Sequence, residues 1–266
     1  MHGDGRVVVI ERVVVIERVV PNRRWHALED DQVVGRAHLR RRPDDRAFVA
    51  ADAWREPVTR ALLDAVAADV PGELYTLAGE DDADQLALLA AAGYQVTRRE
   101  DEFVMPVGPA LAVTVGPVPA GVTIVPADEK ESDRLARLDE RLRQDVPGSD
   151  GWVNDPAEFR AYTFDDHFDP RLYLVAVVGG EYAGLVRVWR GNRVPRLGLL
   201  AVLRWHRRRG LARALLHAAL TPLAERGIEL VSAEADVTNT PAQALLASLG
   251  ARRTGGSVEL RRPGEG

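Results

Sequence analysis

The sequence predicts an α/β protein with a mixed sheet, built as two tandem copies of one fold. Short apolar runs of strand length alternate with longer runs in which apolar residues recur at helical spacing. The order helix, strand, helix, glycine, strand occurs once in each half of the chain. A segment rich in Pro and Gly, residues 106–121, lies between the halves and has the composition of a linker.

Length and composition fit this prediction. The chain has 266 residues, which is long enough for two domains, and 46% of them are hydrophobic. We expect a first, shorter copy at 1–105, the linker at 106–121 and a second copy at 122–266. The formal charge of −5 argues against nucleic-acid binding, which favours a basic domain. The absence of cysteine excludes disulfides, thiolate metal sites and covalent cysteine catalysis.

No membrane partner is expected, because no run of 18 apolar residues occurs. Glu11, Arg12, Glu17 and Arg18 interrupt the apolar N-terminus, which argues against a signal peptide. The expected compartment is therefore the cytoplasm. Monomer and homodimer both remain open.

The first half begins with a repeat, since Val7–Arg12 recurs identically as Val13–Arg18. Because six is an even number, a strand through both copies would keep each residue type on one face. The segment is either a long edge strand or interaction arm, or a small duplication or misplaced start. Strands then follow at 33–39, 47–52, 74–77 and 103–107, and helices at 56–70 and 83–92. Asp82 and Gln85 form a capping box for the second helix.

The second half gives the clearer pattern. It predicts strands at 122–125, 172–178, 182–189, 195–203 and 229–237, and helices at 128–146, 156–166, 211–225 and from Thr240 onward. Gly179-Gly180 and Gly191-Asn192 are turn signals. Thr240 can cap the last helix, whose buried stripe comprises Ala242, Leu245, Leu246 and Leu249. Gly250 ends that helix, and two short strands follow.

The most informative stretch is Arg207–Ala212, which has the pattern Arg-x-x-Gly-x-Ala between a strand and a helix. A glycine and a small residue let a ligand approach the backbone closely. The N–H groups of the first helical turn favour an anion, and a phosphate is the usual one. Arg207, Arg208 and Arg209 add positive charge and bidentate hydrogen bonding. The stretch therefore predicts a pyrophosphate site.

Three motifs stand in order along the second half. They are Leu200-Ala201-Val202, then Arg207-x-x-Gly210-x-Ala212, then Asn239-x-x-Ala242-x-x-Leu245-Leu246-x-x-Leu249-Gly250. Together they resemble the GNAT superfamily, the acyl-CoA-dependent N-acyltransferases, over about residues 122–262. The first half resembles a degenerate GNAT repeat, because Trp54–Thr59 stands where the Arg-x-x-Gly-x-Ala motif would lie. The resemblance implies two tandem GNAT-like domains, the first truncated and structural in role.

The resemblance also implies acetyl-CoA as co-substrate, without a metal. The pantetheine arm would add alongside Leu200-Ala201-Val202 as an extra strand does, and a backbone N–H near Leu200 would polarise the thioester carbonyl. Asn239 stands at the family's cofactor-side asparagine. The pyrophosphate would be held by the amides of Arg207, Arg208, Arg209, Gly210, Leu211 and Ala212.

Candidates for the chemistry follow from the need for a neutral amine. An alkyl amine has a pKa near ~10, so some group or a water chain must take its proton at neutral pH. Glu234 resembles a general-base glutamate of ribosomal-protein N-terminal acetyltransferases in this superfamily, with Asp236 as the substitute; the alternative is a solvated or ion-paired strand glutamate. Leu246 stands where many members carry a tyrosine that protonates the thiolate. Gly198 and Leu199 stand where many have a glutamate.

Candidates for the acceptor side lie between residues 145 and 167. Asp145, Asp150 and Asp155, with His167, form an acidic region that would attract a cationic amine, unless it is a solvated loop. His206 either assists phosphate binding or lies on the surface. Trp152, Tyr162 and Phe164 either line an acceptor pocket or belong to the core. No cluster has metal-site spacing.

The leading hypothesis is direct transfer of an acetyl group from acetyl-CoA to the primary amine of a small, cationic molecule. Two alternatives remain open at this point. One is acetylation of protein N-termini or side chains, and the other is a non-catalytic protein that binds acyl-CoA or another ligand.

Overall fold

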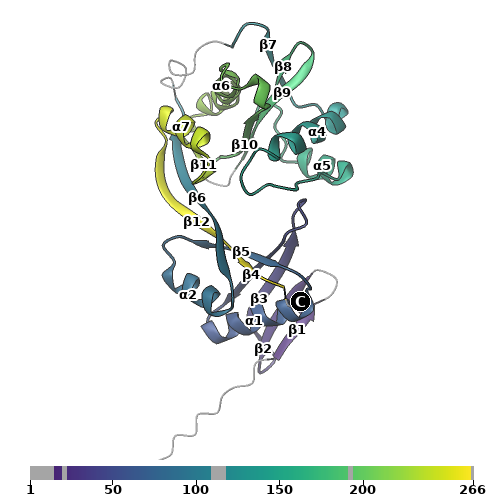
Figure 1. Cartoon of the computed structure of the whole chain (residues 1–266), viewed down its shortest axis with the longest axis vertical. Helices are drawn as coiled ribbons and strands as arrows, with labels where there is room; N and C mark the ends of the chain where they lie inside the picture. Colours follow the sequence, from purple (N-terminus) through teal and green to yellow (C-terminus); the bar gives the residue numbers. More distant parts are fainter. Residues whose placement is uncertain (1–14, 20–22, 109–117, 191–193, 265–266) are drawn as a thin grey trace, which may run out of the picture.

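The fold comes from a computed structural model that describes residues 15–19, 23–108, 118–190 and 194–264. Within these residues twelve strands form one sheet in the order β1-β2-β3-β4-β5-β12-β6-β11-β10-β9-β8-β7, and six α-helices pack beside it (Figure 1). Parallel and antiparallel neighbours both occur. The predicted class, α/β with a mixed sheet, is confirmed.

The first half supplies β1 to β6 and two helices. Their bounds are β1 (Val15–Val19), β2 (Arg24–Glu29), β3 (Gln32–Arg41), β4 (Ala47–Ala53), α1 (Glu56–Asp69), β5 (Leu74–Gly79), α2 (Ala83–Ala91) and β6 (Gln95–Pro106). The pattern missed β2, since Trp25 and Ala27 are its only fully buried residues. It also missed the first eight residues of β6, which are polar or exposed.

The second half supplies the rest. Its elements are β7 (Val122–Pro126), η1 (Glu129–Glu131), α4 (Ser132–Arg143), α5 (Pro156–Thr163), β8 (Tyr173–Val178), β9 (Glu181–Trp189), β10 (Arg196–Val202), η2 (Arg204–His206), α6 (Leu211–Ala224), β11 (Leu230–Asp236), α7 (Thr240–Ser248) and β12 (Arg252–Arg262). The two short strands expected after Gly250 are one long strand, β12. The Gly191-Asn192 turn lies outside the described residues, as does the first copy of the N-terminal repeat. The second copy ends within β1, an edge strand paired with β2.

Equivalent helices in the two halves begin with equivalent caps. The Asn239 side chain accepts a hydrogen bond from Ala242 N at 3.2 Å, so Asn239 and not Thr240 caps α7. Asp82 caps α2 in the same way, accepting from Gln85 N at 3.0 Å. Asn and Asp are strong caps because their short side chains reach the free amides of the first turn. The prediction for Thr240 was wrong by one residue, because Pro241 was placed at the first helical position.

The two halves exchange their last strands. β12, the last strand of the second half, lies between β5 and β6 of the first. β6, the last strand of the first half, lies between β12 and β11. In Figure 1 these long strands, blue and yellow, run side by side from one half of the molecule to the other. The boundary at 106–121 stays a prediction, and its residues 109–117 lie outside the described residues. The described sheet joins the two halves.

The exchange places corresponding residues in corresponding registers. Leu77 of β5 lies opposite Glu259 of β12, just as Glu234 of β11 lies opposite Glu102 of β6. Gly79 lies opposite Ser257 as Asp236 lies opposite Glu100. β5 thus corresponds to β11 and β12 to β6, which gives a direct way to compare the two repeats.

Helices cover both faces of the sheet in the second half. Leu215 and Leu216 of α6 and Leu246 of α7 share one buried cluster with Val231 and Ala233 of β11. A separate cluster joins α4 and α5 to the other face. It contains Leu135, Leu142, Phe159, Tyr173, Leu185 and Leu199. In the first half the cluster around Leu62, Leu63 and Val66 of α1 is the described core.

Candidate active site

The strands β10 and β11 pair in parallel and then diverge. Their register contains only the pairs Arg196–Ser232 and Leu197–Ala233. The later residues of β10, including Leu200, Ala201 and Val202, pair with β9 alone. The edge of β10 that faces β11 is therefore open to an added strand in the described part of the chain, which is what the pantetheine interpretation requires.

The segment that follows β10, residues 203–210, is called here the arginine loop. Gly210 is the N-cap of α6 with φ of +84°, a conformation that favours glycine, and Arg208 also has a positive φ of 63°. The first intrahelical bond runs from Ala214 N to Gly210 O at 3.0 Å. The amides of Leu211 and Ala212 precede it and point out of the helix N-terminus. This geometry suits an anion beside α6.

The three arginines of the motif differ in their surroundings. Arg207 donates from Nε to Val202 O at 2.8 Å and from Nη2 to Asp145 Oδ2 at 2.7 Å. Arg204 also binds Asp145, at 3.1 Å. These arginines, Arg204 by its hydrogen bond above all, hold the pKa of Asp145 below its ordinary value. Arg208 and Arg209 are exposed.

The residue at the family's tyrosine position is part of the core. Leu246 is 5% exposed and packs with the α6 and α7 cluster. It has no polar atom with which to protonate a thiolate. Asn239, seven residues earlier, is half-buried at the start of α7, where its side-chain oxygen is taken by the cap.

Glu234 and Asp236 project from the same face of β11, here called the Glu234 face. Both oxygens of Glu234 bind Arg196 of β10, with Oε1 at 2.9 Å from Nε and Oε2 bound by Nη2. Asp236 is buried, and its Oδ1 accepts from Thr238 N at 2.7 Å and from the Thr238 hydroxyl at 2.5 Å. Asp236 thus organises the turn into α7, whereas Glu234 lies at the point where β10 and β11 separate.

Three comparisons bear on this arrangement. The model of the Acetyltransferase (GNAT) family matches residues 136–251. The mycothiol acetyltransferase of Salinispora arenicola (strain CNS-205) is 31% identical over 219 residues, which cover 78% of this chain and 69% of the relative. That of Thermomonospora curvata is 29% identical over 248 residues, covering 89% and 81%.

Solved structures show the same fold. A tandem GNAT protein from the clavulanic acid biosynthesis pathway superimposes with a TM-score of 0.69 at 20% identity, covering 91% of this chain and 83% of that one. A GCN5-related N-acetyltransferase from Sphaerobacter thermophilus gives 0.67 at 18% identity, with 92% and 82% covered. The chain belongs to the GNAT family of acetyltransferases. It is an acyltransferase with two GNAT-like domains in tandem, as the resemblance implied.

The acidic region expected at the acceptor side of this GNAT protein is largely engaged in its own structure. Asp145 binds the arginine loop, and Asp155 caps α5 by accepting from Glu158 N at 2.8 Å. His167 is exposed, and its backbone N–H donates to Asp165. Asp150 is exposed. Steering of a cation by these aspartates is therefore weaker than their number suggests.

The predicted aromatic residues divide between packing and the surface. Phe164 packs against the α4 and α5 cluster. Trp152 lies 4.1 Å from the Arg143 guanidinium and donates to Asn154. Tyr162 is exposed, with Arg187 over its ring at 5.6 Å. His206 is half-buried within the arginine loop, and no described group bonds its Nδ1.

The first repeat contacts the loop between α4 and α5 directly. Arg42 and Arg46, at the tip of the β3–β4 hairpin, both donate to Gly148 O in the loop between α4 and α5. In that loop Val153 N also donates to Pro43 O at 3.3 Å. The hairpin thus braces the loop that the sequence placed beside the acceptor.

Two residues of the Glu234 face were not singled out from the sequence. Arg196 binds Glu234, and Glu102 lies opposite Glu234 on β6. Their positions depend on the strand exchange and on register, for which the sequence carries no local signal.

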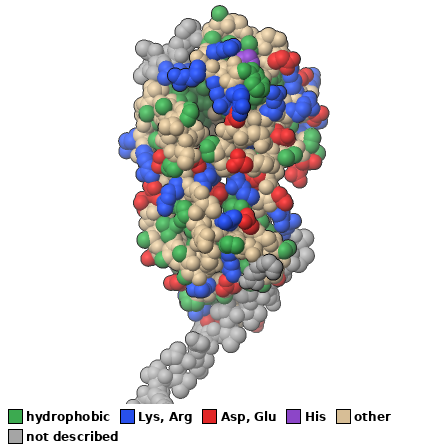
Figure 2. All heavy atoms as spheres, in the orientation of Figure 1, with side chains coloured by type: hydrophobic (Ala, Val, Ile, Leu, Met, Phe, Trp, Pro, Cys, Tyr) green, Lys and Arg blue, Asp and Glu red, His purple; other side chains and the backbone are tan. Residues whose placement is uncertain are grey.

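Basic and acidic side chains interleave over the face seen in Figure 2, with blue Lys and Arg side chains gathered over the upper half, which carries β7–β11.

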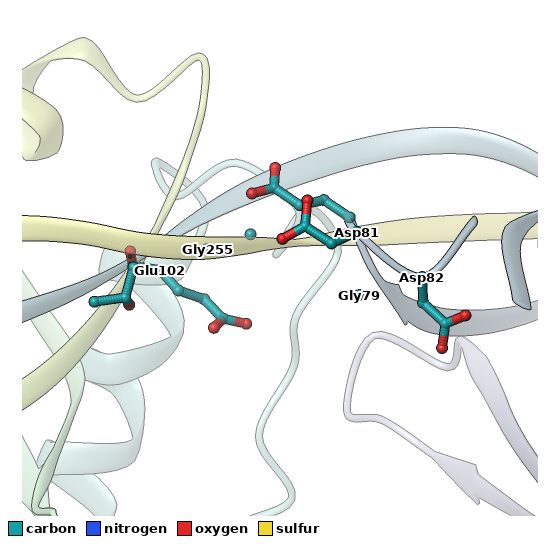
Figure 3. A pocket seen from close by; sticks show the side chains of 8 residues that line it. Gly79, Asp81, Asp82, Glu102 and Gly255 are labelled. Atoms are coloured by element: carbon teal, nitrogen blue, oxygen red, sulfur yellow. Dashed lines mark hydrogen bonds between the residues drawn. The ribbon is translucent and has the colours of Figure 1, made fainter. Parts of the chain in front are cut away.

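An open hollow lies beside this face at the end of β5. It is lined by Gly79, Glu80, Asp81, Asp82, Glu102, Thr254, Gly255 and Gly256. Figure 3 shows Glu102 at one end and Asp82 at the other, with the bare backbone of Gly255 between them. Its carboxylates make it unsuitable for phosphate, so the arginine loop remains the better anion site. The described residues contain no group of side chains that could hold a metal and no helix long and apolar enough to cross a membrane.

Proposed function

We propose that this protein transfers an acetyl group from acetyl-CoA to the primary amine of a small, cationic molecule, by direct attack of the amine on the thioester. The observation that carries the proposal is the arginine loop. It combines an uncapped helix N-terminus, Gly210 in a left-handed conformation and two exposed arginines beside a diverging strand edge. Those features fit a diphosphate followed by an extended, amide-rich arm. Like its mycothiol acetyltransferase relatives, the protein would then acetylate one specific metabolite.

In this proposal the residues divide the work as follows. Acetyl-CoA supplies the activated acetyl group. The amides of residues 207–212 with Arg208 and Arg209 hold the diphosphate, and a backbone N–H near Leu200 donates to the thioester carbonyl. Glu234 is the base nearest the strand divergence, yet Arg196 occupies both its oxygens, so it accepts a proton only when Arg196 moves. Asp236 and Asn239 act through the turn and cap into α7.

Thermal denaturation with acetyl-CoA tests the cofactor half. A ligand at 100 times its Kd stabilises the native state by about 2.7 kcal/mol, so a rise in Tm is expected. Gly210→Glu abolishes the rise, because it strains the positive φ and puts a carboxylate at the anion site. Arg55→Glu, at the N-cap of α1 in the first repeat, retains it. A wild-type protein whose Tm ignores acetyl-CoA would contradict the proposal.

Thiol release with a panel of amines tests the transfer half. We expect acetyl-CoA-dependent release of free CoA with at least one small amine. A Tm shift without release for any small amine or peptide would instead identify a non-catalytic acyl-CoA-binding protein, consistent with Leu246 at the tyrosine position.

A further inference from the structure

Glu102 reaches the second repeat on a strand that belongs to the first. It lies on β6 directly opposite Glu234 of β11 in the antiparallel register. Residues directly opposite on antiparallel strands have Cα atoms about 4.5–5.5 Å apart and side chains on the same face. Two carboxylates therefore lie side by side on the Glu234 face, next to the point where β10 and β11 diverge.

The two carboxylates are not equivalent. Glu234 is held by Arg196 through both oxygens. The Glu102 side chain is half-buried, and within the described parts of the chain no hydrogen bond or ion pair engages its carboxylate. Like charges directly opposite each other destabilise a sheet. The carboxylate of Glu102 can therefore accept hydrogen bonds from a ligand. Its negative charge beside Glu234 destabilises the folded state, so stability does not explain a glutamate at this position.

Glu259 occupies the position in β12 that corresponds to Glu102 in β6, so the surroundings of the two glutamates can be compared. Glu259 of β12 lies opposite Leu77 and is 3% exposed. Its oxygens bind Arg46 at 3.1 Å and Arg98 at 3.1 Å. One glutamate is thus fully paired by arginines, while Glu102 has none.

Space for a ligand adjoins Glu102. Its side chain lines the open hollow, where Gly255 of β12 presents backbone without a side chain (Figure 3). The Glu102 carboxylate lies just 3.7 Å from the position that a Cβ on Gly255 would take. A ligand group entering from the hollow could therefore approach Glu102 over bare backbone.

We propose that Glu102 is the acceptor-binding carboxylate of this enzyme: it binds the ammonium group of the acceptor and receives its first proton. The inference rests on the proposed acetyl transfer and names a residue contributed by the first repeat. After that proton leaves, the amine nitrogen forms the C–N bond to the acetyl carbon and the C–S bond breaks. The thiolate takes up one proton, so the sum is R–NH3⁺ plus acetyl-CoA giving the amide, CoA-SH and one H⁺, which Glu102 releases to water.

The test compares Glu102→Gln with wild type in two measurements. Glucosamine, tyramine and spermidine are titrated calorimetrically into protein in the presence of CoA, and thiol release is followed with acetyl-CoA across pH. For the best amine, E102Q raises the Kd at least about 10-fold and lowers kcat/KM about 100-fold at neutral pH. Its pH–rate profile also loses the acid-side fall that a carboxylate base produces. Glu102→Asp restores part of that fall.

Glu259→Gln is the matched control. It lowers Tm because it removes a buried partner of two arginines, while the pH profile of the folded enzyme keeps its shape. If E102Q has the same amine Kd and the same pH–rate profile as wild type, the role of Glu102 is overturned, while the proposed acetyl transfer is not contradicted. Amine binding that depends on Glu102 without thiol release would support Glu102 and contradict the transfer. If no amine binds wild type, both proposals fall.

Discussion

The two strand-to-helix junctions of this protein share a geometry and differ in chemistry. In the first repeat β4 pairs with β5 in parallel for only two residue pairs, as β10 does with β11 in the second. After β4, only Trp54 and Arg55 precede α1, whose first turn contains Glu56 and Pro57. After β10, the arginine loop precedes α6 and ends in Gly210.

The difference teaches that diverging parallel strands alone do not make an anion site. Glu56 places negative charge at the N-terminus of α1, and Pro57 has no N–H to donate. At α6 the first turn has no acidic residue, and the loop before it is basic. The backbone scaffold was kept in both repeats, while the residues that favour phosphate occur in the second.

The largest expected effect is the difference in unfolding free energy between the Glu259→Gln and Glu102→Gln variants. Glu259→Gln removes the charge-assisted hydrogen bonds from two mostly buried arginines, Arg46 and Arg98, which costs about 3 kcal/mol in the free energy of unfolding even though Asp44 and Glu100 remain as their other partners. For a chain of this length that is a fall in Tm of roughly 6–12 °C. Glu102→Gln changes the unfolding free energy by less than about 0.5 kcal/mol. Chemical denaturation of both variants measures this, and equal losses would show that the two glutamates are equivalent after all.

A middle-sized effect compares the two helix caps. Asn239→Ala and Asp82→Ala each remove one side-chain acceptor at a helix N-terminus and should each cost about 1 kcal/mol. Asn239→Ala should also reduce the Tm shift given by acetyl-CoA, and Asp82→Ala should not. A shift unchanged in both variants would remove Asn239 from the cofactor side.

The smallest effect concerns Asp145. Asp145→Asn at pH 7 should cost under about 1 kcal/mol, because its partners Arg204 and Arg207 are largely exposed. The folded-state pKa of Asp145 is lowered, so its contribution is complete above the unfolded value near ~3.9 and is lost as pH falls through the folded value. The difference between wild type and variant should therefore vanish in acid. Asp150→Asn in the same loop is the control, and a difference that persisted in acid would contradict the assignment.

Local patterns predicted most elements and the arginine loop, because both depend on neighbours in sequence. Apolar periodicity located α1, α6 and β9 within a residue or two. It missed the first part of β6, where ion pairs such as Arg98 with Glu100 replace apolar packing. It gave Glu234 but neither Arg196 as its partner nor Glu102 as its neighbour, because register and strand exchange are set by contacts distant in the chain.

The strand exchange has a consequence for how the protein is made. β5 leaves the ribosome long before its partner β12, because β6 to β11 lie between them along the chain. During synthesis the nascent first repeat therefore carries an unpaired strand edge, the kind of edge that recruits other chains. The sheet of the first repeat is complete only when β12 has been synthesised. A nascent chain stalled before β12 therefore exposes an unpaired, aggregation-prone edge, and chaperones would be needed most at that stage.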